Sequence, residues 1–85
     1  MKVFSYEIKD AIGIHARPAG LLAKEAKKYE SKITLSLNGK RAEATGVMGI
    51  MSLGAKHGQS IEVTVEGPDE EAAMTGMKIF FEENL

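Results

Sequence analysis

The most informative stretch of the sequence is Gly13-Ile14-His15-Ala16-Arg17-Pro18-Ala19, which places a histidine directly before the start of a predicted helix. Pro18 suits the first turn of a helix, where its missing N–H costs no hydrogen bond and its fixed φ is already helical. The first N–H groups of a helix have no partners, and the helix dipole makes that end positive. The stretch therefore predicts a helix that begins beside an anion site.

The side chains in this stretch indicate what the anion site could do. Histidine is neutral, nucleophilic and able to hold a proton near pH 7. An imidazole at an anion site suggests a nitrogen that accepts and then releases a phosphoryl group, and His15 is our candidate acceptor. Arg17 and the backbone of the Ala16, Arg17 and Pro18 region can share the phosphate charge. For an isolated histidine beside a proline, the alternative is a cap or a packed surface residue.

Length and composition exclude several other classes of protein. Eighty-five residues fit one domain, 1–85, and no cysteine is present, so no disulfide or zinc–thiolate site is available. Two histidines without cysteine predict no metal site, and no motif predicts a cofactor. No segment resembles a signal peptide or a membrane span, so we expect a soluble, cytoplasmic protein without direct membrane insertion.

The charges are distributed unevenly, although the net charge is only −1. Residues 15–32 hold five basic and two acidic side chains, whereas residues 66–85 hold six acidic and one basic. The basic patch is too small for nucleic acid and is more typical of a surface that attracts an acidic protein partner. A chance imbalance among solvated helix faces explains the charges equally well.

Outward from the histidine, the hydrophobic pattern predicts the element order β-α-β-β-α-β-α. Alternating residues predict the strands, and Asn38-Gly39 predicts a tight hairpin turn between the second and third strands. Asp69 is predicted to cap the last helix. The expected elements are strands near 4–9, 33–38, 40–44 and 61–65, and helices near 16–29, 47–53 and 70–83. Strands of period two imply a sheet with one wet face, so the helices should cover the other face.

Two of these helices carry apolar residues that their buried stripes do not need. Helix 16–29 has its apolar stripe at Ala19, Leu22, Ala23 and Ala26, which leaves Leu21 on the solvent side among cations. Met48 and Met51 could lie exposed beside Leu21 while Ile50 and Leu53 pack inward. Filling of gaps in the core explains the methionines equally well, and both readings stay open on the sequence.

Two blocks of sequence carry a resemblance to a known family. Gly13 to Ala19 and Val47-Met48-Gly49-Ile50-Met51-Ser52-Leu53-Gly54 resemble HPr, the histidine-containing phosphocarrier of the phosphoenolpyruvate-dependent sugar phosphotransferase system. The length, the element order and the Asn38-Gly39-Lys40 turn agree as well. The resemblance implies an α+β fold, an open-faced sandwich of a four-stranded antiparallel sheet with three helices on one face.

The resemblance also implies a function and partners. A histidine matching His15 takes a phosphoryl group on Nδ1 from phosphorylated Enzyme I and passes it to a histidine of a sugar-specific IIA domain, assisted by a residue matching Arg17. The chemistry is shared with these partner enzymes, and the carrier is expected to be a monomer. The surfaces implied to dock both partners match Gly20, Leu21, Lys24, Lys27, Val47, Met48 and Met51.

The sequence departs from the family pattern at two positions. Many relatives carry a regulatory serine where this chain has Gly46, so we predict that the corresponding kinase does not phosphorylate this protein. Thr45 could substitute only if the kinase tolerated a shifted register, and modification of Thr45 or Ser52 would overturn that prediction. Ile12 stands where several relatives have a small hydroxyl residue near the phosphate.

Two other functions remain open on the sequence. One is an HPr-like carrier of a nitrogen-related or dihydroxyacetone-kinase phosphotransfer chain, because such paralogues share the site. The other is a non-catalytic regulatory interaction module, against which the presence of both His15 and Arg17 argues. The second histidine, His57, lies in a predicted turn and is read as an exposed loop residue.

Overall fold

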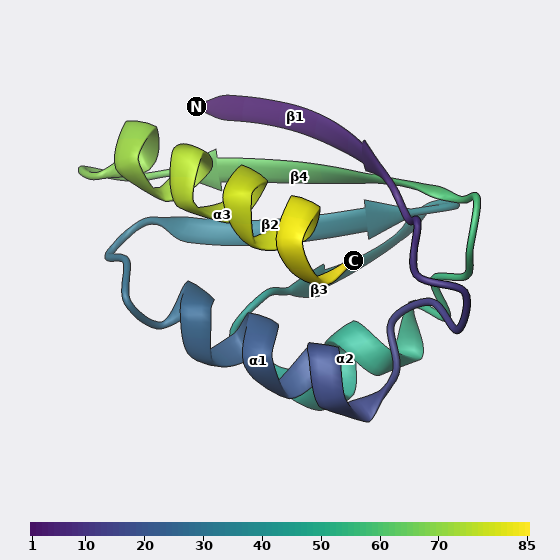
Figure 1. Cartoon of the computed structure of the whole chain (residues 1–85). Coiled ribbons are helices and arrows are strands. Elements are labelled where there is room, and N and C mark those ends of the chain that lie inside the picture. Colours follow the sequence, from purple (N-terminus) through teal and green to yellow (C-terminus); the bar gives the residue numbers. More distant parts are fainter.

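A computed structural model describes residues 1–85 and shows one four-stranded antiparallel sheet with three helices on one of its faces (Figure 1). The strands are β1 (Lys2–Glu7), β2 (Lys32–Leu37), β3 (Lys40–Glu43) and β4 (Ser60–Glu66), and they lie in the order β1-β4-β2-β3. The helices are α1 (Ala16–Ala26), α2 (Val47–Ser52) and α3 (Glu70–Asn84). The predicted element order and the open-faced sandwich are confirmed.

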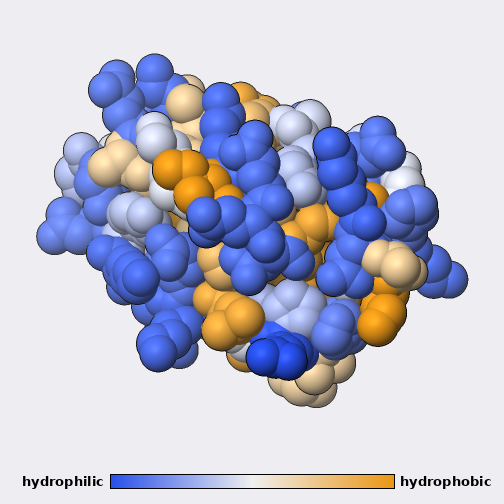
Figure 2. Space-filling model, in the orientation of Figure 1, coloured by the Kyte–Doolittle hydropathy of each residue, from blue (hydrophilic) through white to orange (hydrophobic).

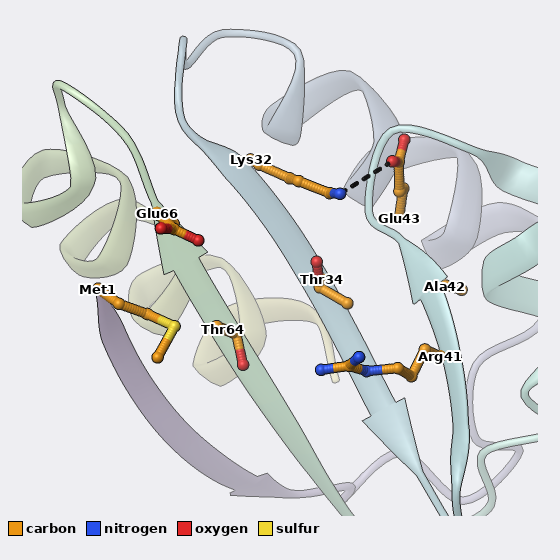
Figure 3. Close-up of a pocket in the computed structure, with 8 residues that line it drawn as sticks. All are labelled: Met1, Lys32, Thr34, Arg41, Ala42, Glu43, Thr64 and Glu66. Carbon is orange, nitrogen blue, oxygen red and sulfur yellow. Dashed lines mark ion pairs between the residues drawn. The ribbon is translucent and has the colours of Figure 1, made fainter.

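The two faces of the sheet follow from the period-two alternation of its strands. In β2 and β4 the buried positions are Ile33, Leu35, Leu37, Ile61, Val63 and Val65. Thr34 and Thr64 are paired across these strands and point to the opposite face. Figure 3 looks onto that opposite face, where polar side chains surround a shallow hollow that no helix covers. The sheet therefore has one apolar face for the helices and one wet face, as alternation predicts.

The helices fill the space over the apolar face. The predicted stripe of α1 is buried, and α2 buries Ile50 as expected. From α3, Phe81 is fully buried and makes edge-to-face contacts with Phe4, Tyr6 and Phe80. Such aromatic contacts add to the apolar area that the ring buries. This cluster fixes α3 against β1.

The hairpin between β2 and β3 has the predicted turn. Asn38 and Gly39 have φ of 50° and 80°, which are the two positive values that a tight hairpin turn requires. Leu37 and Lys40 are partners in the sheet on either side of this turn. The turn thereby sets the register of β3.

The structure corrects the predicted end of α1. The helix ends at Ala26, three residues before the predicted Tyr29. The backbone tightens there, because the N–H groups of Lys28 and Tyr29 bond to carbonyls three residues earlier. The Tyr29 hydroxyl donates to Glu25 at 3.2 Å and lies where a side chain at Gly76 of α3 would have to go. Packing of α1 against α3 thus ends the helix early.

The structure also corrects the predicted role of Asp69. It occupies the N-cap position of α3, but its side chain makes no capping hydrogen bond. Its carboxylate instead accepts the N–H groups of Glu30 and Ser31, each at 2.9 Å, and the Ser31 hydroxyl. Hydrogen bonding by Ser31 and Glu30 lowers the pKa of Asp69 below its ordinary value. The residue joins two loops rather than capping its own helix.

Candidate functional site

The segment before α1 is held by backbone bonds to the loop that precedes β4. Ile8 exchanges backbone hydrogen bonds with Gln59 and Gly58, each at 2.8 Å, and the Ile14 N–H donates to the Ala55 carbonyl at 3.1 Å. Gly13 has a φ of 84°, and a Cβ there would lie 2.3 Å from the Ala55 oxygen. Only glycine fits this close approach. The position of His15 is therefore fixed by Gly13 and Ile14.

His15 occupies the N-cap position of α1 with an extended backbone, φ −107° and ψ −172°. Its carbonyl accepts the Ala19 N–H at 3.0 Å, which is the first bond of the helix. Pro18 has no N–H, so the amides of Ala16 and Arg17 are the two that begin the helix without an intrahelical partner. The imidazole makes no capping bond and is half-buried, so it stays available beside these two amides.

A shallow hollow opens beside the imidazole. It is lined by Asp10, His15, Arg17, Pro18, Leu21 and Asn84. The structure thus brings together three residues that the motif predicted, His15, Arg17 and Pro18, with Leu21 of the predicted docking surface. Ala16 lies between His15 and Arg17 and is exposed.

Sequence reasoning missed two residues of this hollow, Asp10 and Asn84. Asp10 had a usable signal, because an Asp three residues before a glycine is typical of a turn. The Asp10 carboxylate accepts the Ile12 N–H at 2.9 Å, and its carbonyl accepts the Gly13 N–H at 3.0 Å. Asn84 had no local signal, since only the packing of α3 brings the end of that helix to the site.

Three cations of α1 and its C-cap carry no ion pairs. Arg17, Lys24 and Lys27 lie more than an ion-pair distance from every carboxylate, whereas Lys28 pairs with Glu25 at 3.0 Å. An unpaired guanidinium is free to turn toward an incoming phosphate, to which it can donate two parallel hydrogen bonds. No existing ion pair has to break before Arg17 meets a phosphate.

Exposed apolar side chains on α1 and α2 form, with the three unpaired cations, what we call the docking face. It comprises Arg17, Gly20, Leu21, Lys24, Lys27, Val47, Met48 and Met51. Leu21 is 45% exposed, Met48 79% and Met51 39%, whereas Ile50 and Leu53 are buried. The structure therefore favours the exposed reading of the two methionines over the core reading. Figure 2 shows hydrophobic residues exposed among hydrophilic ones over the region of α1 and α2.

Three other residues singled out in the sequence lie outside the hollow. Gly46 is the exposed N-cap of α2, and the nearest atom to a Cβ there would be 3.8 Å away, so a serine would fit. Ile12 is exposed and does not line the hollow. His57 is exposed in the loop before β4 and is not among the residues that line it.

Comparison with known proteins identifies the family. The family model described as the PTS HPr component phosphorylation site matches residues 3–83. The chain belongs to the HPr family. The HPr phosphocarrier protein of Mycoplasma genitalium is 41% identical over 85 residues, which cover 99% of this chain and 97% of the relative.

Solved HPr structures agree with the fold. HPr from Thermoanaerobacter tengcongensis is 39% identical and superposes with a TM-score of 0.93, covering 99% of this chain and 94% of its own. An HPr dimer from the same organism is 40% identical, with a TM-score of 0.77 over 98% of this chain and 95% of its own. The chain is an HPr-type phosphocarrier of the phosphotransferase system, and its partners are phosphotransfer proteins of that system. None of its helices combines the length and apolar character that crossing a membrane requires.

Proposed function

We propose that His15 accepts a phosphoryl group from phosphorylated Enzyme I and passes it to a histidine of a sugar-specific IIA domain. One observation carries the proposal. The imidazole stands at the N-cap of α1 with no hydrogen bond in the cap, and it opens into a hollow that also holds Arg17. A nucleophile and a guanidinium thus line one hollow, at the helix end where the amides of Ala16 and Arg17 have no intrahelical partner.

The transfer balances without an additional reactant. A lone pair of the His15 imidazole, on Nδ1 as the family resemblance implies, attacks phosphorus in line with the nitrogen of the donor phosphohistidine. The new N–P bond forms as the donor N–P bond breaks, and the donor imidazole leaves with the electron pair. Arg17 and the amides of Ala16 and Arg17 donate hydrogen bonds to the phosphoryl oxygens. Reversal of the same steps delivers the group to the acceptor.

The openness of the site suits a carrier. His15 is half-buried and the hollow is shallow, so a phosphoryl group there stays accessible to a partner histidine. A carrier that enclosed its phosphate would bind it too tightly for onward transfer. The rigid attachment of Gly13 and Ile14 to Ala55 keeps the imidazole in place for both half-reactions.

The docking face supplies the surface on which the donor and the acceptor bind in turn. Leu21, Met48 and Met51 give an apolar centre, and Lys24 and Lys27 give a basic rim that attracts acidic partners. Methionine side chains adapt to more than one surface, which suits a protein with two partners. We propose that the chain acts in the cytoplasm as a monomer. The monomer is favoured because β1 pairs with β4 of the same chain and because self-association over α1 and α2 would block the docking face.

A phosphotransfer assay tests the proposal. The chain is incubated with phosphoenolpyruvate and Enzyme I, and intact mass is measured beside a His15→Ala variant. We expect one added phosphoryl group that is labile in acid and absent from the variant, and its chase onto IIA proteins identifies the sugar pathway. A folded sample that gains no phosphoryl group from active Enzyme I would contradict the proposal and leave a different donor or a regulatory module.

A further inference from the structure

Asp10 lines the hollow beside His15. Its side chain accepts the Ile12 N–H at 2.9 Å and its carbonyl accepts the Gly13 N–H at 3.0 Å. Its own N–H donates to the main-chain oxygen of Leu85 at 2.8 Å. These three bonds fix the residue relative to the segment that carries His15, and one carboxylate oxygen takes no part in them.

The turn does not explain the charge of Asp10. An asparagine places a carbonyl oxygen at the same position and makes the same turn as readily. A neutral side chain would also avoid negative charge beside a site that must hold a phosphoryl dianion. The carboxylate is therefore the feature of this residue that the fold leaves unexplained.

The charges that face the hollow come from few groups. Among its lining residues Asp10 is the only carboxylate and Arg17 the only permanent cation, while Asn84 is neutral. Asp10 and Arg17 do not form an ion pair. A phosphoryl group on His15 would thus be attracted by Arg17 and the helix amides and repelled by Asp10.

We infer that the Asp10 carboxylate keeps the phosphoryl group on His15 transferable by opposing its negative charge, a role that rests on His15 as the acceptor. Asp10 is a positioning and tuning residue, since it acts on the phosphoryl group through the field in the hollow. Arg17 and the amides stabilise phosphohistidine, and the carboxylate limits that stabilisation. The carrier can then receive the group and still release it.

The size of the effect follows from Coulomb's law. A carboxylate and a dianion on opposite sides of one small hollow in water repel each other. This repulsion changes the equilibrium constant for phosphorylation by about eightfold without screening and by about twofold with the screening of physiological salt. Replacing the carboxylate by an amide should shift the equilibrium toward phosphorylated carrier by that factor. The shift should fade in 1 M salt, where the screening length falls to about 3 Å.

The test compares Asp10→Asn with Asp10→Ala and the wild-type chain. Each is equilibrated with Enzyme I at a fixed ratio of phosphoenolpyruvate to pyruvate, and the phosphorylated fraction is measured by intact mass in low and high salt. Asp10→Asn should keep the wild-type melting temperature and raise the equilibrium constant for phosphorylation about two- to eightfold at low salt. Asp10→Ala should melt lower, because the Ile12 N–H loses its acceptor.

Three other outcomes would contradict either the role of Asp10 or the proposed function of His15. An Asp10→Asn variant that phosphorylates as the wild type does, or less, would overturn the inference. A rise of equal size in high salt would also overturn it, since a structural cause does not depend on screening. If the wild-type chain itself gains no phosphoryl group, or His15→Ala still gains one, the proposed function fails and the inference falls with it.

Discussion

Replacement of Gly13 by alanine should damage both the stability and the transfer reaction of this protein. Gly13 has a φ of 84°, and an added Cβ would lie 2.3 Å from the Ala55 oxygen and 2.9 Å from the Lys56 Cα. Both neighbours are backbone atoms, so the segment itself must move. That movement breaks the hydrogen bond from the Ile14 N–H to the Ala55 carbonyl. Because Ile14 directly precedes His15, the imidazole moves as well.

A matched control separates the two costs of this substitution. Gly39 has nearly the same φ, 80°, but a Cβ there meets nothing within 4 Å. Gly39→Ala should cost only the strain of a positive φ, about 1–2 kcal/mol. Gly13→Ala adds the lost hydrogen bond and the displaced backbone, for a total of about 2–4 kcal/mol. The loss of chain entropy on replacing glycine is common to both and cancels in the comparison.

Thermal unfolding and a phosphotransfer assay measure the two effects. Each kcal/mol should lower the melting temperature of a domain of this size by about 4–8 °C. Below the melting transition, Gly13→Ala should also slow phosphorylation of His15, because its imidazole is displaced, whereas Gly39→Ala should transfer at the wild-type rate. A Gly13→Ala variant as stable as Gly39→Ala and as fast as wild type would refute the idea that Gly13 positions His15.

Four further predictions test other parts of the account. Gly20→Ala should stabilise the fold by about 1 kcal/mol, because alanine favours a helix and the space is empty, yet it should weaken partner binding in a titration. Leu21→Ser should lower partner affinity several-fold, while Ile79→Ser, 49% exposed on α3, should leave it unchanged; equal losses would contradict the docking face. Gly46→Ser should create a substrate for the serine-specific kinase, seen as a mass increase that the wild-type chain does not show. For Asp69 the folded-state pKa is lowered, so its stabilising effect is present above the ordinary value of 3.8 and is lost as pH falls through the lowered pKa. The melting temperature of Asp69→Asn should therefore approach that of wild type as the pH drops below 3.8, and a constant gap would contradict the role of this carboxylate.

Local patterns were sufficient wherever one residue type has one strong structural use. Asn38-Gly39 predicted its turn because few other residues accept two positive φ values. The stripe on α1 and the exposure of Leu21 followed from helical spacing alone. The start of α1 followed from Pro18, and the position of His15 followed from that start.

The errors and omissions share a cause, which is contact between distant parts of the chain. The Tyr29 ring meets Gly76 of α3, so α1 ends before the pattern would end it. The carboxylate of Asp69 bonds to Glu30 and Ser31 rather than to its own helix. Neither contact has a signal within a short window of sequence, and the same holds for Asn84 in the hollow.

The most direct test of the central claim is to locate the phosphoryl group on the chain. After reaction with phosphoenolpyruvate and Enzyme I, tandem mass spectrometry under conditions that preserve phosphohistidine should place a single phosphoryl group on His15. A His57→Ala variant should accept it equally well, since His57 is not among the residues that line the hollow. A phosphoryl group found on His57, or on a serine or threonine while His15 stays unmodified, would contradict the account.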